Sequence, residues 1–177
     1  MINITILANG KGVYSMNLSE LLLEEFKDEA EKTKEALSRI PEGCLTFRPH
    51  EKSMSIGQLG LHIALLPGEL TVYFSELIRE VPTVPLSEAS SVSEILDTFE
   101  HNRRITSGWL TEWGTEELFA EWQMKQNGEI LMKGPRYTFI RSLVLNHWYH
   151  HRGQLTLYLR LLEVPVPGLY GSSADEE

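Results

Sequence analysis

The segment NHWYHHRGQL, residues 146–155, places three histidines within five positions of a chain that contains only 6. An imidazole can bind a metal ion, transfer a proton, or simply contribute to the polar surface of a helix. The segment belongs to an expected helix from about Arg136 to Leu162, which ends at the breaker sequence VPVPG. The role of His147, His150 and His151 therefore depends on the helix face that each one occupies.

Helical geometry separates these three histidines into two kinds. With about 100° between successive residues, His151 falls at the centre of an apolar stripe. His147 lies about 40° from it, whereas His150 lies about 100° away, at the flank. Residues four apart on a helix have Cβ atoms about 5 to 6 Å apart, so two imidazoles can reach one metal ion at about 2.0 to 2.1 Å. We expect His147 and His151 to face the core together.

A third ligand is expected from the second helix, where His62 lies on the apolar stripe with Leu59 and Leu66. Buried imidazoles without partners are unfavourable, and a shared metal ion would satisfy them. Three neutral imidazoles leave a coordination position open, as in catalytic rather than structural metal sites. The alternative is a set of ordinary core histidines with hydrogen-bond partners, because a single core histidine or an isolated H-x-x-x-H pair is a weak indication of metal.

Side chains that could assist catalysis are few. Glu69, two turns after His62, is a candidate base, with a solvated carboxylate as the alternative. Gln154 is a candidate to hydrogen-bond a bound water, and a glutamine bonded to backbone or solvent is the alternative. Gly153 is unusual in a helix interior and predicts the close approach of another helix.

Four segments carry apolar residues at helical spacing and must position these histidines. A linker, VPTVPLSEASS, separates the second from the third and allows a long crossover. The Asn127-Gly128 pair between strand-like runs predicts a small β-hairpin before the last helix. Together these features predict an all-α fold, a four-helix bundle with a hairpin insertion. The expected helices run from Leu18 to Ile40, from Ser55 to Leu77, from about Val92 to Leu110 and from about Arg136 to Leu162.

Composition limits the functional classes. The 177 residues, 42% of them hydrophobic, predict a single domain over 1–177, with an N-terminal extension at 1–17 and a C-terminal tail at 164–177. The acidic end of this tail, GSSADEE, is expected to be solvated. The net charge of -9 and the lack of a basic cluster argue against nucleic acid as a partner. We found no signal peptide and no apolar run of about 18 residues, which predicts no membrane span and a cytoplasmic location. Cys44 is the only cysteine, so no internal disulfide can form.

Two sequence stretches and the helical layout between them resemble the DinB/YfiT-like superfamily of metalloenzymes. The stretches are TFRPHEKSMSIGQLGLHIA and NHWYHHRGQLTLYLRLLEVPVPGLYGSSADE, and the resemblance extends from about Leu18 onward. It implies a DinB-type bundle that holds a divalent metal, commonly nickel or zinc, through one histidine of the second helix and the last helix's H-x-x-x-H. Those positions fall on His62, His147 and His151. Iron, cobalt and manganese also suit such ligands, and family members often form homodimers.

Two reactions fit such a site, because a divalent ion with three neutral ligands lowers the pKa of a bound water or thiol. In the first, which the resemblance favours, a low-molecular-weight thiol such as bacillithiol, mycothiol or glutathione binds as the thiolate and attacks a small-molecule electrophile. In the second, a metal-activated water hydrolyses an amide or ester. A bundle with no enzymatic role is the third alternative.

Overall fold

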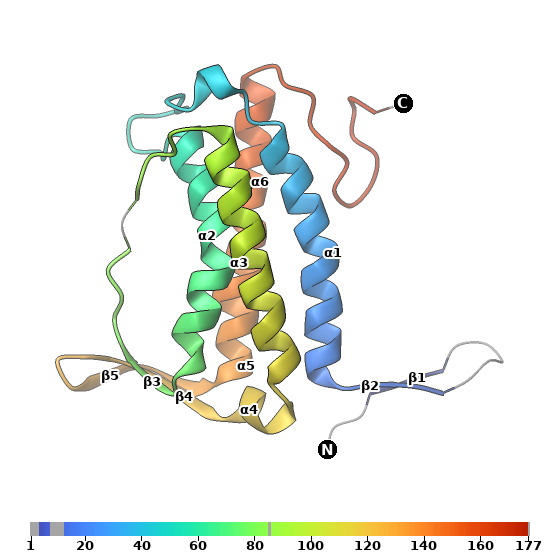
Figure 1. Cartoon of the computed structure of the whole chain (residues 1–177), viewed down its shortest axis with the longest axis vertical. Helices are drawn as coiled ribbons and strands as arrows, with labels where there is room; N and C mark the ends of the chain where they lie inside the picture. Colours follow the sequence, from blue (N-terminus) through green and yellow to red (C-terminus); the bar gives the residue numbers. More distant parts are fainter. Residues whose placement is uncertain (1–3, 8–12, 85, 177) are drawn as a thin grey trace.

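The computed structural model describes residues 4–7, 13–84 and 86–176, and its long helices lie side by side in one bundle (Figure 1). The expected four-helix bundle is confirmed. Short helical segments cover its two ends, η1 (Glu42–Cys44) and α4 (Thr115–Phe119). The bundle itself consists of α1 (Leu18–Ser38), α2 (Ile56–Ser75), α3 (Val92–Glu112) and a last helical segment made of α5 (Arg136–Phe139), η2 (Ile140–Asn146) and α6 (His147–Leu161).

Side-chain caps explain where the first helices begin. The Asn17 side chain accepts a hydrogen bond from the amide of Glu20, whose own side chain accepts from the Asn17 amide. Ser55 and Gln58 form the same reciprocal pair at the start of α2. Each pair satisfies amides that the helix itself leaves without a partner. Residues 55–58 carry the S-x-x-Q pattern of a capping box, and both of its hydrogen bonds are present.

The connection between α2 and α3 is the long crossover that the linker sequence predicted. It runs along the outside of the bundle, so that α2 and α3 point in the same direction (Figure 1). Hydrogen bonds attach its second half to α2, because Gln58 donates to the Leu86 carbonyl and Ser55 to the Glu88 carboxylate. This segment consequently covers the outer face of α2, the helix that carries His62.

The predicted hairpin is present, with a third strand that the sequence did not indicate. Strands β4 (Glu121–Gln126) and β5 (Glu129–Pro135) pair antiparallel. The turn residues Asn127 and Gly128 both have positive φ, 53° and 85°, as the favoured two-residue hairpin turns require. Strand β3 (Ile78–Glu80) adds to β4 in parallel. A separate antiparallel pair, β1 (Ile4–Leu7) and β2 (Val13–Met16), precedes α1.

The bundle core is aromatic at its centre, where Trp148 of α6 contacts all three other long helices. Its ring stacks on Phe26 of α1 at 5.3 Å and on Phe99 of α3 at 6.2 Å between ring centroids. Its indole N–H donates to the Ile63 carbonyl of α2 at 3.0 Å. One side chain thus fixes α6 against the rest of the bundle. None of the helices in the described ranges is both long and apolar enough to cross a membrane.

The last helix differs from the uniform α-helix expected from Arg136 to Leu162. Residues 140–146 form a π-helical stretch, η2, directly before His147. The amide of His147 bonds to the carbonyls of Ser142 and Val144. A π-helical turn contains an extra residue, so it rotates the following side chains relative to the preceding ones. The sequence pattern gave no sign of this change.

Residues 171–176 of the acidic end are largely exposed, and Asp175 pairs with Arg160 of α6 at 2.6 Å. Tyr170, directly before them, bonds to Glu29 of α1. One further expectation is wrong. Gly153 marks no close approach, because nothing lies within 4 Å of where its Cβ would be. The close approach occurs at Gly68 of α2, where an added Cβ would lie 2.7 Å from the Cβ of Asn102 on α3.

Candidate metal centre

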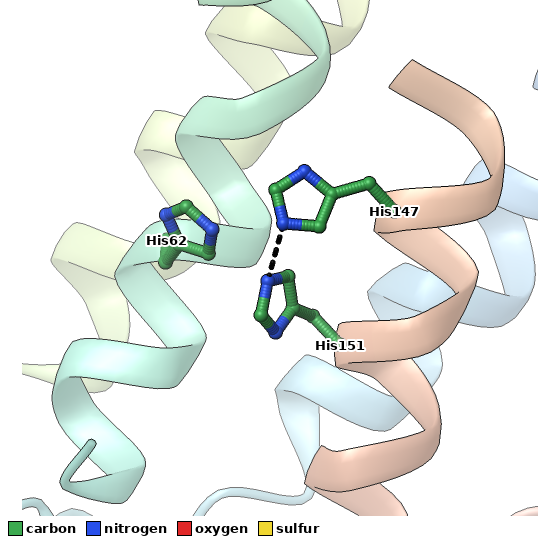
Figure 2. Close-up of side chains that lie close together, drawn as sticks. All are labelled: His62, His147 and His151. Carbon is green, nitrogen blue, oxygen red and sulfur yellow. Dashed lines mark hydrogen bonds between the residues drawn. The ribbon is translucent and has the colours of Figure 1, made fainter. Parts of the chain in front are cut away.

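Three imidazoles from two helices meet on the inner side of α2 and α6 (Figure 2). They belong to His62, His147 and His151, and their potential ligand nitrogens all lie within 4.8 Å of one another. The ring centroid of His62 is 5.6 Å from that of His147 and 4.6 Å from that of His151. The structure therefore brings together the three histidines that helical geometry singled out.

The spacing of these nitrogens fits a small metal ion. The Nε2 atoms of His147 and His151 are 2.7 Å apart and share a hydrogen bond. Two nitrogens bound to a tetrahedral ion at about 2.0 to 2.1 Å would lie roughly 3.3 Å apart, so an opening of about 0.6 Å would let both bind. Rotation about the side-chain bonds can supply a movement of this size. Three imidazoles are a donor set typical of zinc, nickel, cobalt or iron.

Electrostatics keep the cluster uncharged. Burial, with contributions from neighbouring imidazoles, lowers the pKa of His151 to about 4. Burial also lowers the pKa of His62, as does the proximity of His147. For His147, burial lowers the pKa although a hydrogen bond with the Leu143 backbone opposes the shift. Neutral imidazole is the form that binds metal, so the site is prepared for a cation at neutral pH.

The side chain of Gln154 orients His151. Its Oε1 lies 2.7 Å from Nδ1 of His151, which must carry the proton to donate to an amide oxygen. The lone pair of His151 is then on Nε2, the nitrogen that faces His147. A partner of this kind fixes the tautomer and ring orientation of a metal ligand. Sequence reasoning suggested a water contact for Gln154 and missed this one, which the i, i+3 spacing from His151 could have indicated.

Trp148 and the π-helical stretch position the histidine pair relative to His62. Trp148 follows His147 in sequence, and the carbonyl that it binds belongs to Ile63, which follows His62. The contact therefore holds the two ligand-bearing turns at one level of the bundle. The π-helical stretch ends at His147, and such irregular turns frequently occur at functional sites.

A cavity of about 200 Å³ opens beside the cluster. Its walls come from α2, η2, the start of α6 and the crossover between α2 and α3. Apolar side chains make up most of the wall. The residues that line it are His62, Leu66, Glu69, Leu70, Val84, Leu143 and His147.

The remaining candidates fall outside the cluster. His150 is exposed, although its ring centroid is 5.1 Å from that of His151. Glu69 is exposed at the edge of the cavity. It follows His62 by seven residues, which corresponds to roughly 10 Å along the helix axis. At that separation Glu69 is better placed to contact a distal part of a bound molecule than the atom that reacts at the metal. The role of Glu69 as a base stays a prediction.

Comparison with known proteins identifies the family of this chain. The sequence model of the DinB family matches residues 14–177, nearly the whole chain. The chain belongs to the DinB family. Within the family, YrdA of Bacillus subtilis, an uncharacterized protein, is 24% identical over 160 residues, which cover 87% of this chain and 89% of YrdA.

Solved structures of DinB-like proteins share the fold. A DinB-like protein from Bacillus cereus superposes with a TM-score of 0.68 at 23% identity, over 84% of this chain and 95% of the other. YfiT from Bacillus subtilis, described as a probable metal-dependent hydrolase with an unusual four-helix bundle topology, superposes with a TM-score of 0.65 at 14% identity, over 86% and 93%. Identities this low establish the common bundle and do not transfer an activity.

Proposed function

We propose that this DinB-family protein is a divalent-metal-dependent enzyme in which His62, His147 and His151 hold the ion. The observation that carries the proposal is the convergence of three imidazoles beside an apolar cavity. Low pKa values keep them in the metal-binding form, and Gln154 presents the lone pair of His151 to the centre. Nickel and zinc are the preferred ions, and iron, cobalt and manganese are the others to be tested.

The residues around the cluster have separate tasks. When bound, a divalent ion with three neutral ligands keeps its full charge and lowers the pKa of a water or thiol ligand. The side chains of Leu66, Leu70 and Leu143 exclude bulk water from one side of the centre, which strengthens electrostatic interactions there. They also provide the contact surface for an apolar substrate.

The reaction we favour is the transfer of a low-molecular-weight thiol to an electrophile. Among the described residues that line the cavity, none is a serine, cysteine, lysine or tyrosine that could act as a nucleophile. We therefore favour a nucleophile supplied by a second substrate. A thiol would serve, because its sulfur is a good ligand for zinc and nickel.

Hydrolysis of an amide or ester is the second candidate function. It requires only water as the nucleophile and the same histidine centre. The description of YfiT, a structural neighbour, as a probable metal-dependent hydrolase supports this candidate.

Metal analysis of protein purified without a histidine tag tests the shared part of both proposals. We expect stoichiometric divalent metal in the wild-type protein and in His150→Ala, whose imidazole is exposed, and its loss in His147→Ala. All three proteins should be folded by circular dichroism. Absence of metal from the wild-type protein, after supplementation with each ion, would overturn the proposal.

A second measurement separates the two reactions. We expect bacillithiol, mycothiol or glutathione to raise the melting temperature of the metal-loaded protein and to have no effect on His147→Ala. A metal-loaded protein that responds to no thiol, yet hydrolyses ester or amide probes in a manner that requires His147, would favour hydrolysis instead.

A further inference from the structure

Among the described residues that line the cavity at the metal centre, Glu69 is the one charged side chain, because the histidines there are neutral. Its carboxylate is exposed on α2, two helical turns from His62. Ion pairs of the described residues involve other nearby acids, Glu76 with Arg79 and Glu88 with Arg48, and leave Glu69 without a basic partner. A carboxylate at the rim of an apolar cavity is placed to pair with the positively charged end of a bound ligand.

The cavity continues beyond Glu69. A second hollow of about 160 Å³ shares Glu69, Leu70 and Val84 with the first and extends to Tyr73 and Arg79. Glu69 therefore stands between the histidine cluster and the outer hollow. A molecule that enters through the outer hollow passes this carboxylate before its leading end reaches His62.

Arg79 is the basic residue of the outer hollow, and its charge is already engaged. Its guanidinium lies 3.0 Å from the Glu76 carboxylate and 5.2 Å from the centre of the Tyr73 ring. The pair with Glu76 leaves this end of the hollow close to neutral. With Arg79 paired in this way, Glu69 is the charged residue without an ion-pair partner among the described residues of the two hollows, and the overall charge of -9 acts in the same direction. An anionic substrate is disfavoured on both counts.

We propose that Glu69 is a specificity-determining residue that binds a cationic nitrogen of the substrate. The proposal rests on the metal-dependent function above and holds for either reaction. The substrate class is an amphiphilic molecule with its reactive group at the histidine cluster, an apolar middle section, and an ammonium or guanidinium group about two helical turns away. Leu66 and Leu70, which lie on α2 between and beside these points, contact the apolar section.

Hydroxamates provide a test, because the hydroxamate group binds a metal ion and its tail can be varied. We would measure the affinity of metal-loaded protein for three compounds with a linear chain of about six carbons, long enough to span two helical turns. The chains end in an ammonium, a hydroxyl or a carboxylate group. Acetohydroxamate, which has no tail, reports on the metal centre alone.

We expect the ammonium compound to bind about fivefold more tightly than the hydroxyl compound, and the carboxylate compound to bind most weakly. Glu69→Gln should abolish the preference and leave acetohydroxamate binding unchanged. Glu112→Gln is the matched control, because Glu112 is an exposed acid of α3 that lines neither hollow, and it should keep the preference.

Equal affinity for all three compounds would overturn the role of Glu69 while leaving the metal centre intact. A preference for the carboxylate compound, if Arg79→Gln removes that preference, would do the same. Failure of acetohydroxamate itself to bind in a metal-dependent manner would overturn the proposed function, and the role of Glu69 with it.

Discussion

The Nε2 atoms of His147 and His151 lie 2.7 Å apart across one turn of α6. Each ring also makes a second hydrogen bond. Gln154 holds Nδ1 of His151, and the backbone of Leu143 hydrogen-bonds to His147. Two adjacent lone pairs repel each other without a proton or a cation between them. In the neutral pair the two lone pairs face each other, and a metal ion between them would remove this repulsion when His62 completes the site.

Replacement of Gln154 should weaken metal binding without removing a ligand. Gln154→Leu deletes the acceptor for Nδ1 of His151, so the ring loses its fixed tautomer, and we expect metal affinity to fall about tenfold or more. Gln154→Glu keeps an acceptor and should retain affinity. Competition with a chromophoric chelator measures the effect, with Gln123→Leu on β4 as a matched surface control. Unchanged affinity in Gln154→Leu would show that this contact does not orient the ligand.

Acid should destabilise the metal-free protein before it protonates His151 in the folded state. The pKa of His151 is lowered to about 4, whereas an unfolded histidine has a pKa of about 6.5. Between these values the unfolded chain binds the proton and the folded chain does not. The contribution of His151 to the free energy of unfolding is therefore full above pH 6.5 and is lost as the pH falls toward 4.

NMR titration of metal-free protein measures this pKa directly. We expect the His151 Cε1 proton, assigned with a His151→Gln variant, to keep the chemical shift of a neutral imidazole at pH 5.5. A midpoint near 6.5 in folded protein would contradict the burial of this ring. Urea unfolding between pH 7 and pH 5 should show a decreasing free energy of unfolding, and the decrease should be smaller in His151→Gln.

A buried ion pair behind the metal centre should dominate the stability of α6. Arg152 is buried and bonds to the carboxylate and carbonyl of Glu29 and to Thr33 on α1. Burial alone would raise the pKa of Glu29, but hydrogen bonds from Lys32, Tyr170 and Arg152 outweigh it and lower the pKa. The carboxylate is therefore ionised in the folded protein.

Removal of the Glu29 charge leaves the Arg152 guanidinium buried and unpaired. We expect Glu29→Gln to lower the free energy of unfolding by about 3 kcal/mol, and Tyr170→Phe by about 1 kcal/mol through loss of the hydroxyl that bonds to Glu29 and Arg152. Glu24→Gln, at an exposed position of the same helix, should have little effect. Urea denaturation measures all three, and equal stabilities of Glu29→Gln and Glu24→Gln would contradict the structural role of the pair.

Periodicity and local signals predicted much of this molecule because they act within a few residues. Apolar spacing located the four long helices, S-x-x-Q marked the start of α2, and Asn127-Gly128 marked the hairpin. Helical angles separated the inward pair His147 and His151 from His150, because all three lie within α6, after the π-helical stretch has ended.

Features that depend on contacts between distant segments were not predictable. Strand β3 is a short strand that pairs with β4, more than forty residues further along the chain. The contacts of Tyr170 with Glu29 and Arg152 had no local signal, because these partners come from other elements. A uniform 100° per residue does not represent the π-helical stretch, in which Ile140, Val144 and Leu145 are all buried. The cavity likewise depends on where the crossover lies.

Two helical glycines should respond oppositely to the same substitution. Gly153 is exposed in α6 with nothing near its Cβ position, so Gly153→Ala removes a flexible residue from a helix and should raise the free energy of unfolding by about 0.5 to 1 kcal/mol. Gly68 is buried in α2, and Gly68→Ala would place a methyl group 2.7 Å from the Cβ of Asn102. Because α2 and α3 must then separate, we expect a loss of about 1 to 3 kcal/mol. Urea denaturation of the two variants side by side checks the pair, and a stabilised Gly68→Ala would mean that α2 and α3 do not pack as closely as the structure shows.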